Sequence, residues 1–215
     1  MPISILQNYN YVNDLLSKNN GVYISPKEYE RYGYISSLEM FDDFMGIKTI
    51  PKITIGKNRL IDTRLLPFKK KVTTTFTGET LLKPSDCKYI SAMYEVSSKI
   101  PVRPLDDDRR AKIFQDPLAS PTTDDKYYVE NFSDLTLLGT ENLQVVLEYY
   151  ERPKPIVYGY TVVNGRPVFD QATSVDYQWD ISEQEELTNR ILVKAGLSMS
   201  SPLTLQVANN NKAQE

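Results

Sequence analysis

The chain has 215 residues, 40 % of them apolar and 25 % charged, which is the balance of a globular protein with a core of its own. Its net charge of -3 gives no overall attraction to nucleic acid or anionic membrane, and no apolar run approaches the roughly 20 residues of a transmembrane helix. The absence of histidine and the single cysteine, Cys87, exclude Ser/His and Cys/His catalysis, imidazole metal sites and internal disulfides.

Two helices are predicted at the N-terminus. In residues 2–20, apolar side chains recur at helical spacing. The second helix begins at Ser25, because serine, proline and then Glu28 form a capping sequence, and it ends at Gly46. Apolar residues surround much of its circumference, which fits either a core helix or a helix packed on a neighbouring subunit. In the second interpretation, the candidate contact residues are Tyr34, Leu38, Phe41 and Met45.

From residue 50 the apolar period changes from helical to two residues, which predicts strands. The most distinct strand is 144–150, where both faces are largely apolar, as in a strand covered on both sides of a sheet. Pro153 and Pro155 stop it. Asn164 and Gly165 follow an apolar run at 156–163 and predict a tight hairpin. Further strands are expected at 53–55, 72–76, 89–96, 127–132, 135–138 and 166–169.

Two charged runs in the sequence are candidate binding sites. Lys69–Lys71 is typical of a solvated strand end and not of a phosphate site. Asp106–Asp108 is expected to start a short helix within 104–114, because adjacent aspartates cannot all face one cation. Cys87 has no base or second thiol beside it in the sequence and is interpreted as structural. The sequence therefore predicts no catalytic residue, no cofactor and no metal site, and a protein that is not an enzyme.

Two helical segments are expected at the C-terminus. The first is capped by Asp180 or Ser182 and ends at Gly196. The second starts at Ser201 and Pro202 and covers 203–208, and its candidate contact residues are Leu203, Leu205 and Val207. The first segment's core stripe consists of Leu187, Ile191 and Ala195.

Helices at both ends and strands between them predict an α+β fold with a mainly antiparallel β body, a sandwich or a meander. The expected parts are a helical segment at 1–48, the β body at 49–175 and a helical arm and tail at 176–215. The helical ends are predicted to act as contact arms, because the final apolar segment is too short to fold alone.

Several segments, taken in order, resemble head-to-tail connector proteins of crAss-like and related tailed bacteriophages. They are the Ser25–Tyr29 helix start with its run to Phe41, Phe44 and Gly46; Leu66–Phe68; the Pro117–Pro121 loop before Tyr127; the Tyr149–Pro155 strand ending; and Trp179 through Gly196 to Ala208.

The resemblance implies a structural virion protein, assembled in the host cytoplasm. Such a protein is a ring or adaptor subunit that forms a dodecamer with copies of itself, stacks below the portal protein and contacts adjacent tail or ring proteins. Genomic DNA would pass through the channel without sequence-specific binding, and no membrane is involved. The alternative is a tail or fibre-attachment module that recognises another virion protein or the host surface.

Overall fold

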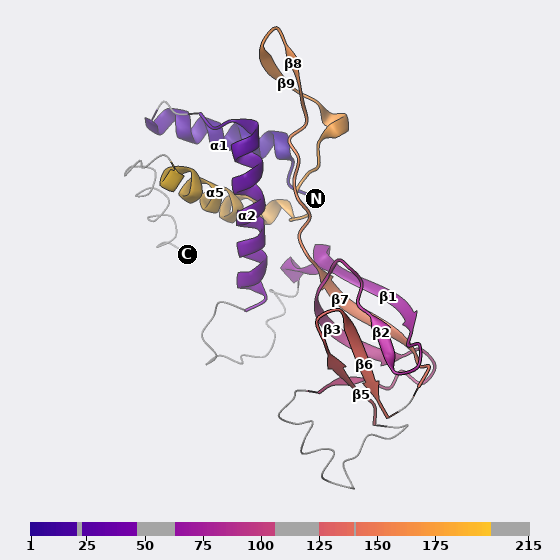
Figure 1. The fold of residues 1–215 in the computed structure, drawn as a ribbon. Coiled ribbons are helices and arrows are strands. Elements are labelled where there is room, and N and C mark those ends of the chain that lie inside the picture. Colours follow the sequence, from indigo (N-terminus) through magenta and orange to yellow (C-terminus); the bar gives the residue numbers. More distant parts are fainter. Residues whose placement is uncertain (21–22, 47–62, 106–124, 140, 199–215) are drawn as a thin grey trace. The chain divides into compact units, whose positions relative to one another are not determined.

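The computed structural model describes residues 1–20, 23–46, 63–105, 125–139 and 141–198. The chain divides into two compact units: the helical unit, 1–67 with 153–215, and the β unit, 68–152. The fold is α+β, with helices near both termini and mainly antiparallel sheets, as the sequence predicts (Figure 1). The division differs from the expected 1–48, 49–175 and 176–215, because residues 153–175 belong with the helices.

The elements are as follows. The helices are α1 (Ile5–Asn20), α2 (Pro26–Phe44) and α5 (Gln184–Ser198), with 3-10 turns η1 (Leu66–Phe68), η2 (Gln171–Thr173) and η3 (Ile181–Glu183). The strands are β1 (Lys69–Thr75), β2 (Thr80–Leu82), β3 (Cys87–Glu95), β4 (Arg103–Pro104), β5 (Tyr127–Glu130), β6 (Asp134–Leu138), β7 (Gln144–Glu151), β8 (Tyr160–Val163) and β9 (Arg166–Phe169).

The β unit contains two sheets, of strand order β1-β7-β3 and β2-β6-β5-β4. Neighbouring strands are antiparallel except for the short β4–β5 pair. Side chains from both sheets form one buried cluster, which joins Leu147 and Tyr149 of β7 to Leu135 and Leu137 of β6. The two sheets therefore share a core, as in a β-sandwich.

Strand β7 is the centre of the β unit. It pairs with β1 on one side and β3 on the other, and six of its eight residues are buried. This confirms the prediction of a strand covered on both faces. The chain meets two prolines directly after β7, so the ladder ends there and residues from Pro153 onward enter the helical unit.

The three consecutive lysines lie inside strand β1, and acidic groups surround them. Lys69 and Lys71 form ion pairs with Glu148 at 2.9 and 3.6 Å, and Lys70 lies 2.6 Å from both Asp86 and Glu151. Lys70 lowers the pKa of the Asp86 carboxyl below its usual value. The prediction of a solvated strand end is confirmed, since the lysines are the first three residues of β1 and remain partly exposed, and they also neutralise acidic side chains of β7 and of the turn before β3.

A second ion pair fixes the turn after β3. Glu95 accepts hydrogen bonds from the hydroxyls of Ser98 at 2.5 Å and Ser97 at 2.7 Å, and from the largely buried ammonium of Lys126 at 2.9 Å. The Ser98 hydroxyl and then Lys126 are the main causes that lower the pKa of Glu95 from about 4.5 to about 2. The folded state therefore favours the ionised carboxylate.

This depressed pKa predicts an acid-dependent contribution to stability. The contribution of Glu95 is complete above pH 4.5 and is lost as the pH falls towards 2, because the unfolded chain binds the proton first. Glu95→Gln is expected to lower the free energy of unfolding by about 1–2 kcal/mol at pH 7 and by much less at pH 2.5. Urea titrations at both pH values measure this. An equal loss at both would contradict the charge-based account.

Helix α2 begins with the predicted capping box. The Ser25 hydroxyl accepts a hydrogen bond from the Glu28 backbone N–H, and the Glu28 carboxylate accepts one from the Ser25 N–H at 2.9 Å. α2 and α1 both pack against α5, whose predicted stripe, Leu187, Ile191 and Ala195, is fully buried.

The centre of the helical unit is a segment without regular structure that carries Tyr177 and Trp179. Both side chains are buried, and the indole N–H of Trp179 donates to the Ser37 hydroxyl at 2.7 Å. Gly33 of α2 makes room, since a Cβ there would lie 2.2 Å from the Tyr177 hydroxyl. Residue Ile3 exchanges backbone hydrogen bonds with this segment, so the N-terminus closes over residues from the other end of the chain.

Some sequence-based boundaries were wrong. α5 does not end at Gly196 but continues to Ser198. Asp180 caps the 3-10 turn η3, which then leads into α5. Pro104 closes strand β4 and does not start a helix. The expected strand 53–55, the Asp106–Asp108 helix start and the terminal helix 203–208 lie outside the described residues.

Candidate interaction surface

The hairpin β8–β9 is the most exposed apolar element that the structure describes. Asn164 and Gly165 form its two-residue turn, with φ angles of 51° and 78°. Two consecutive positive φ angles are those of a type I′ turn, which matches the twist of the strands, so the predicted hairpin is confirmed. The strand itself is shorter than the apolar run 156–163 and begins at Tyr160.

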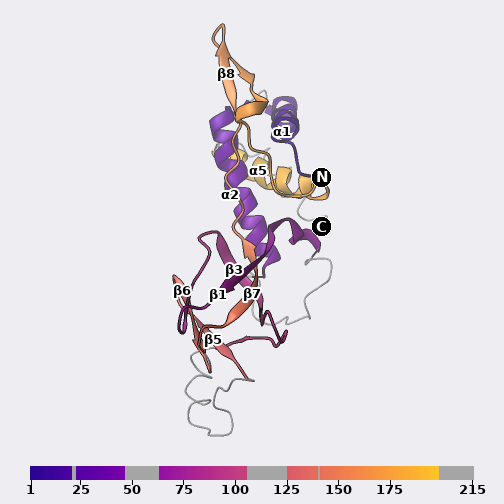
Figure 2. The same cartoon turned by 90° about the vertical axis from the view of Figure 1, so that its right-hand side faces the viewer.

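Nearly every side chain of this hairpin is exposed. Val162, Val163 and Val168 are 67 %, 50 % and 48 % exposed, although valine is a core-forming residue. Within the helical unit the hairpin projects beyond the helices in both views (Figures 1 and 2). An isolated two-stranded hairpin is marginally stable in water, which favours an element that becomes covered in an assembly.

The register separates the two faces of the hairpin. Tyr160 pairs with Phe169 and Val162 with Pro167, so these four apolar side chains share one face. The opposite face carries Thr161, Val163, Arg166 and Val168 and is more polar. We call the first set, Tyr160, Val162, Pro167 and Phe169, the apolar face of the hairpin.

The base of the hairpin is rigidly held. Gly159 permits close packing there, since a Cβ would lie 2.8 Å from the carbonyl oxygen of Asp170. The backbone N–H of Asp170 donates to the Gly159 carbonyl at 2.8 Å, and the N–H of Gly159 donates to the Ser174 hydroxyl at 3.0 Å. These contacts fix the direction in which the hairpin leaves the helical unit.

Aromatic side chains connect this base to the helices. Tyr158 packs against Phe169 on one side and Tyr9 of α1 on the other, with ring centroids 5.1 and 4.5 Å apart. The backbone N–H of Tyr158 donates to Glu30 of α2 at 2.7 Å. Tyr9 also packs on Tyr29, and burial raises the pKa of both hydroxyls well above the usual value. These tyrosines therefore stay neutral and act as structural hydrogen-bonding groups.

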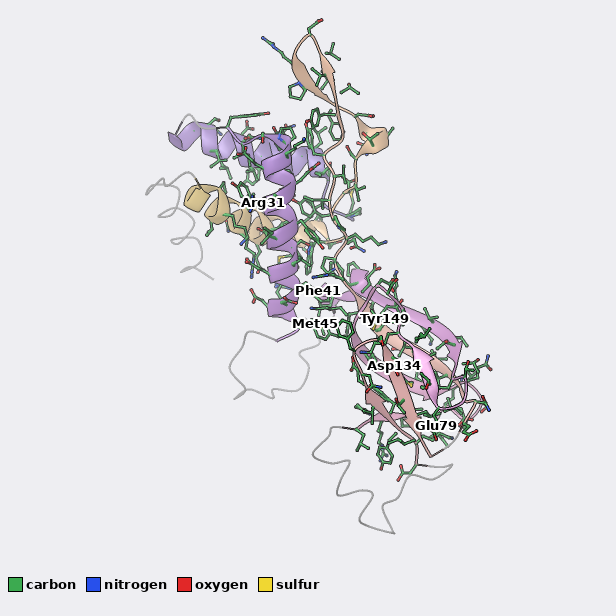
Figure 3. The ribbon with its side chains drawn as sticks, viewed as in Figure 1. Arg31, Phe41, Met45, Glu79, Asp134 and Tyr149 are labelled. Atoms are coloured by element: carbon green, nitrogen blue, oxygen red, sulfur yellow. The ribbon has the colours of Figure 1, made fainter. Side chains whose placement is uncertain are left out.

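The contact residues predicted on α2 do not form one free surface. Phe41 is only 1 % exposed and belongs to the helical core, so it is not available to another subunit. Tyr34, Leu38 and Met45 are half-buried, and Figure 3 shows Met45 at the C-terminal end of the helix. The other three predicted residues, Leu203, Leu205 and Val207, lie outside the described residues.

The β unit carries a second exposed apolar surface. Phe132, in the turn between β5 and β6, is 102 % exposed, and Leu82 at the end of β2 is 75 % exposed. Leu82 pairs with Asp134, the first residue after this turn, and the N–H of Lys83 donates to Ser133 at 3.1 Å. We call Leu82 and Phe132 the β-unit knob. The sequence pattern placed Phe132 in the strand 127–132, but β5 ends at Glu130, and it assigned Leu82 to no strand; the exposure of both side chains was missed.

Three further features of the described residues concern metal ions, a hollow and the thiol. None of their acidic or cysteine side chains gather in threes to hold a metal ion. An open hollow of about 430 Å³ beside α1 is lined by polar and tyrosine side chains, among them Asn13, Asp14 and Tyr23. Cys87 is partly buried, and burial is the main cause that raises the pKa of its thiol to about 11, which disfavours the reactive thiolate.

No helix in the described part of the chain has the length and apolar character needed to cross a bilayer. No protein-family model matches the sequence, and no curated protein matches it either.

Proposed function

We propose that this chain is a structural ring or adaptor subunit of the head-to-tail connector of a tailed bacteriophage. In this role it forms a closed ring of identical copies, with a dodecamer as the expected size, between the portal and the adjacent tail or ring proteins. Genomic DNA passes through the channel without sequence-specific contacts. The protein is a component of the virion and has no catalytic task.

One observation carries the proposal: the chain exposes two separate apolar surfaces, the apolar face of the hairpin in the helical unit and the β-unit knob in the β unit. A cyclic ring requires two unlike surfaces on each subunit, because every copy meets its neighbour head to tail. The exposed valines of β8 and β9 favour protein contact over solvent. The resemblance of the ordered segments to connector proteins supplies the specific role.

The test is the assembly state of the purified protein. Light scattering and native mass measurement are expected to give one closed oligomer, and negative-stain images are expected to show rings. Val162→Lys, on the apolar face, should lower assembly at least about tenfold, because it places a charge in the buried contact. Thr161→Lys is the matched control on the opposite face and should assemble normally. A wild-type protein that remains monomeric at high concentration would contradict the proposal.

The second candidate is a tail or fibre-attachment module that binds another virion protein or a host surface. The β-unit knob favours it, because an exposed phenylalanine at a sheet end is suited to fill a pocket of a partner. The two functions differ in what Phe132→Ala does. A binding module with Phe132→Ala loses its partner and keeps its own assembly state, whereas a ring subunit that uses the β-unit knob loses the closed oligomer.

A further inference from the structure

Strand β8 has an edge that is ready to accept another strand. In a type I′ hairpin the residues that flank the turn, Val163 and Arg166, form a hydrogen-bonded pair, and the pairs alternate from there. The N–H and C=O groups of Val162 and Tyr160 therefore point away from β9. Among the described residues β8 pairs with β9 alone, so this edge is unpaired.

The other edges are protected against such pairing. In β9 the corresponding outward position is Pro167, which has no N–H to donate. In the β unit, β1 carries three lysines, β2 has three residues, and β4 has two residues and ends in Pro104. The end of β3 is covered on its outer side by residues 100–102, which form backbone hydrogen bonds with Met93 and Glu95. Lysine, proline and short length are the usual devices against edge pairing. β8 is short as well, but its four residues include no lysine and no proline, and its outward N–H and C=O groups are open to a partner strand.

A matching sequence occurs in residues 203–207, which lie outside the described residues; a short helix is predicted there, but the same residues also alternate at the period of a strand. Leu203, Leu205 and Val207 alternate with Thr204 and Gln206, and residues 199–211 carry no charge. A strand of this pattern has one apolar and one polar face, as the hairpin does. Its apolar residues would extend the apolar face of the hairpin.

We propose that residues 203–207 of a neighbouring copy add to the β8 edge as an antiparallel third strand, with Leu205 opposite Val162 and Val207 opposite Tyr160. This inference deepens the proposed ring assembly and rests on it. In this register the N–H and C=O of Leu205 and Val207 face β8, and their side chains lie on the apolar face. Successive residues of a strand point their N–H groups to opposite sides. Pro202 alternates with Leu203, Leu205 and Val207, so its missing N–H would face away from β8 and would cost no hydrogen bond.

The donor is a second copy because α5 leads away from the hairpin of its own chain (Figure 1). A strand exchanged in one direction around a ring gives each subunit one accepted and one donated strand, which is a head-to-tail contact.

Cross-linking of two variants tests the donor and the register. Val162→Cys copies are mixed with Leu205→Cys copies that carry a size tag, both with Cys87→Ala. Opposed residues of a hydrogen-bonded antiparallel pair have Cα atoms about 5.5 Å apart, which permits a disulfide. We expect a mixed covalent dimer on a non-reducing gel. A tagged Gln206→Cys copy should cross-link far less, and equal yields or no mixed dimer would overturn the inference.

Proline substitutions test the hydrogen bonds separately. Val162→Pro and Leu205→Pro each remove an N–H that the proposed pairing uses, whereas Val162→Thr and Leu205→Val keep it. Each proline variant should self-associate about tenfold more weakly than its control, because the pairing loses one hydrogen bond and the proline ring disturbs the contact between the strands. If wild type forms rings and the proline variants match their controls, the strand exchange is wrong and the ring stands. If wild type is monomeric, the proposed function itself has failed.

Discussion

Replacing Trp179 with alanine is expected to unfold the helical unit and to leave the β unit folded. The indole is fully buried, contacts Phe44 edge to face with ring centroids 5.7 Å apart, and donates to Ser37. Truncation of a buried tryptophan to alanine costs about 3–5 kcal/mol, which is a large share of the usual stability of a domain. The β unit has its own buried core and needs no residue from this cluster.

Far-UV circular dichroism during thermal unfolding measures this effect. Trp179→Ala should lose the helical signal at temperatures where the wild type keeps it, while the strand signal persists to the wild-type midpoint. Trp179→Phe is the control, because it keeps most of the ring and loses the hydrogen bond to Ser37, at a cost of about 1–2 kcal/mol. Simultaneous loss of both signals would show that the two units do not unfold independently.

Leu147→Ala is expected to have the converse effect. Leu147 is fully buried in the middle of β7, where it contributes to the core shared by both sheets. The cavity left by its side chain should lower the free energy of unfolding of the β unit by about 2–5 kcal/mol. Hydrogen exchange of the β7 amides should accelerate by about 1.5 to 3.5 orders of magnitude, as this free energy implies, while the α5 amides stay protected.

The matched control for this variant is Val72→Ala. Val72 lies directly opposite Leu147 in the register of β1 and β7, but its side chain is exposed at the sheet edge. Val72→Ala should lower the free energy of unfolding by less than about 1 kcal/mol, since the substitution removes little area from the core. If both substitutions cost the same, β7 is not the centre of the β unit.

The sequence was most informative where a local rule matched the tertiary environment. The capping residues at Ser25 and Glu28 begin α2 as predicted, and the Asn164–Gly165 turn forms the expected hairpin. The two apolar faces of β7 indicated a central strand correctly. In each case the physical cause lies within a few residues of the chain, or in the burial of both strand faces.

The buried face of α2 was not predictable in the same way. The predicted stripe contains Tyr34 and Leu38, which are half-buried, while Gly33, Ser36 and Ser37 are fully buried. Small residues carry no hydrophobic signal, yet they permit the close approach of Tyr177 and accept the hydrogen bond of Trp179. A search for apolar side chains therefore overlooks a helix face that is buried because its side chains are small.

The candidate surface shows a related difficulty. The alternation of β8 predicted a strand, but the same pattern describes a strand in a core and a strand in solvent. Only the register shows that Val162 and Tyr160 share an apolar face, and only the burial shows that this face is uncovered.

The pairing of β1 with β7 has a consequence for how the chain folds during synthesis. Lys69 lies opposite Tyr150, so the β unit begins and ends at neighbouring positions and forms a closed insertion between two parts of the helical unit. All of its strands leave the ribosome before Tyr177 and Trp179 do, so it can fold while α1 and α2 still lack their central aromatic residues. The helical unit must then wait for the last part of the chain. A ribosome stalled where residues 68–152 have left the exit tunnel and Tyr177 and Trp179 are still inside it should accordingly display a protease-resistant fragment that covers 68–152 and no resistant helical fragment.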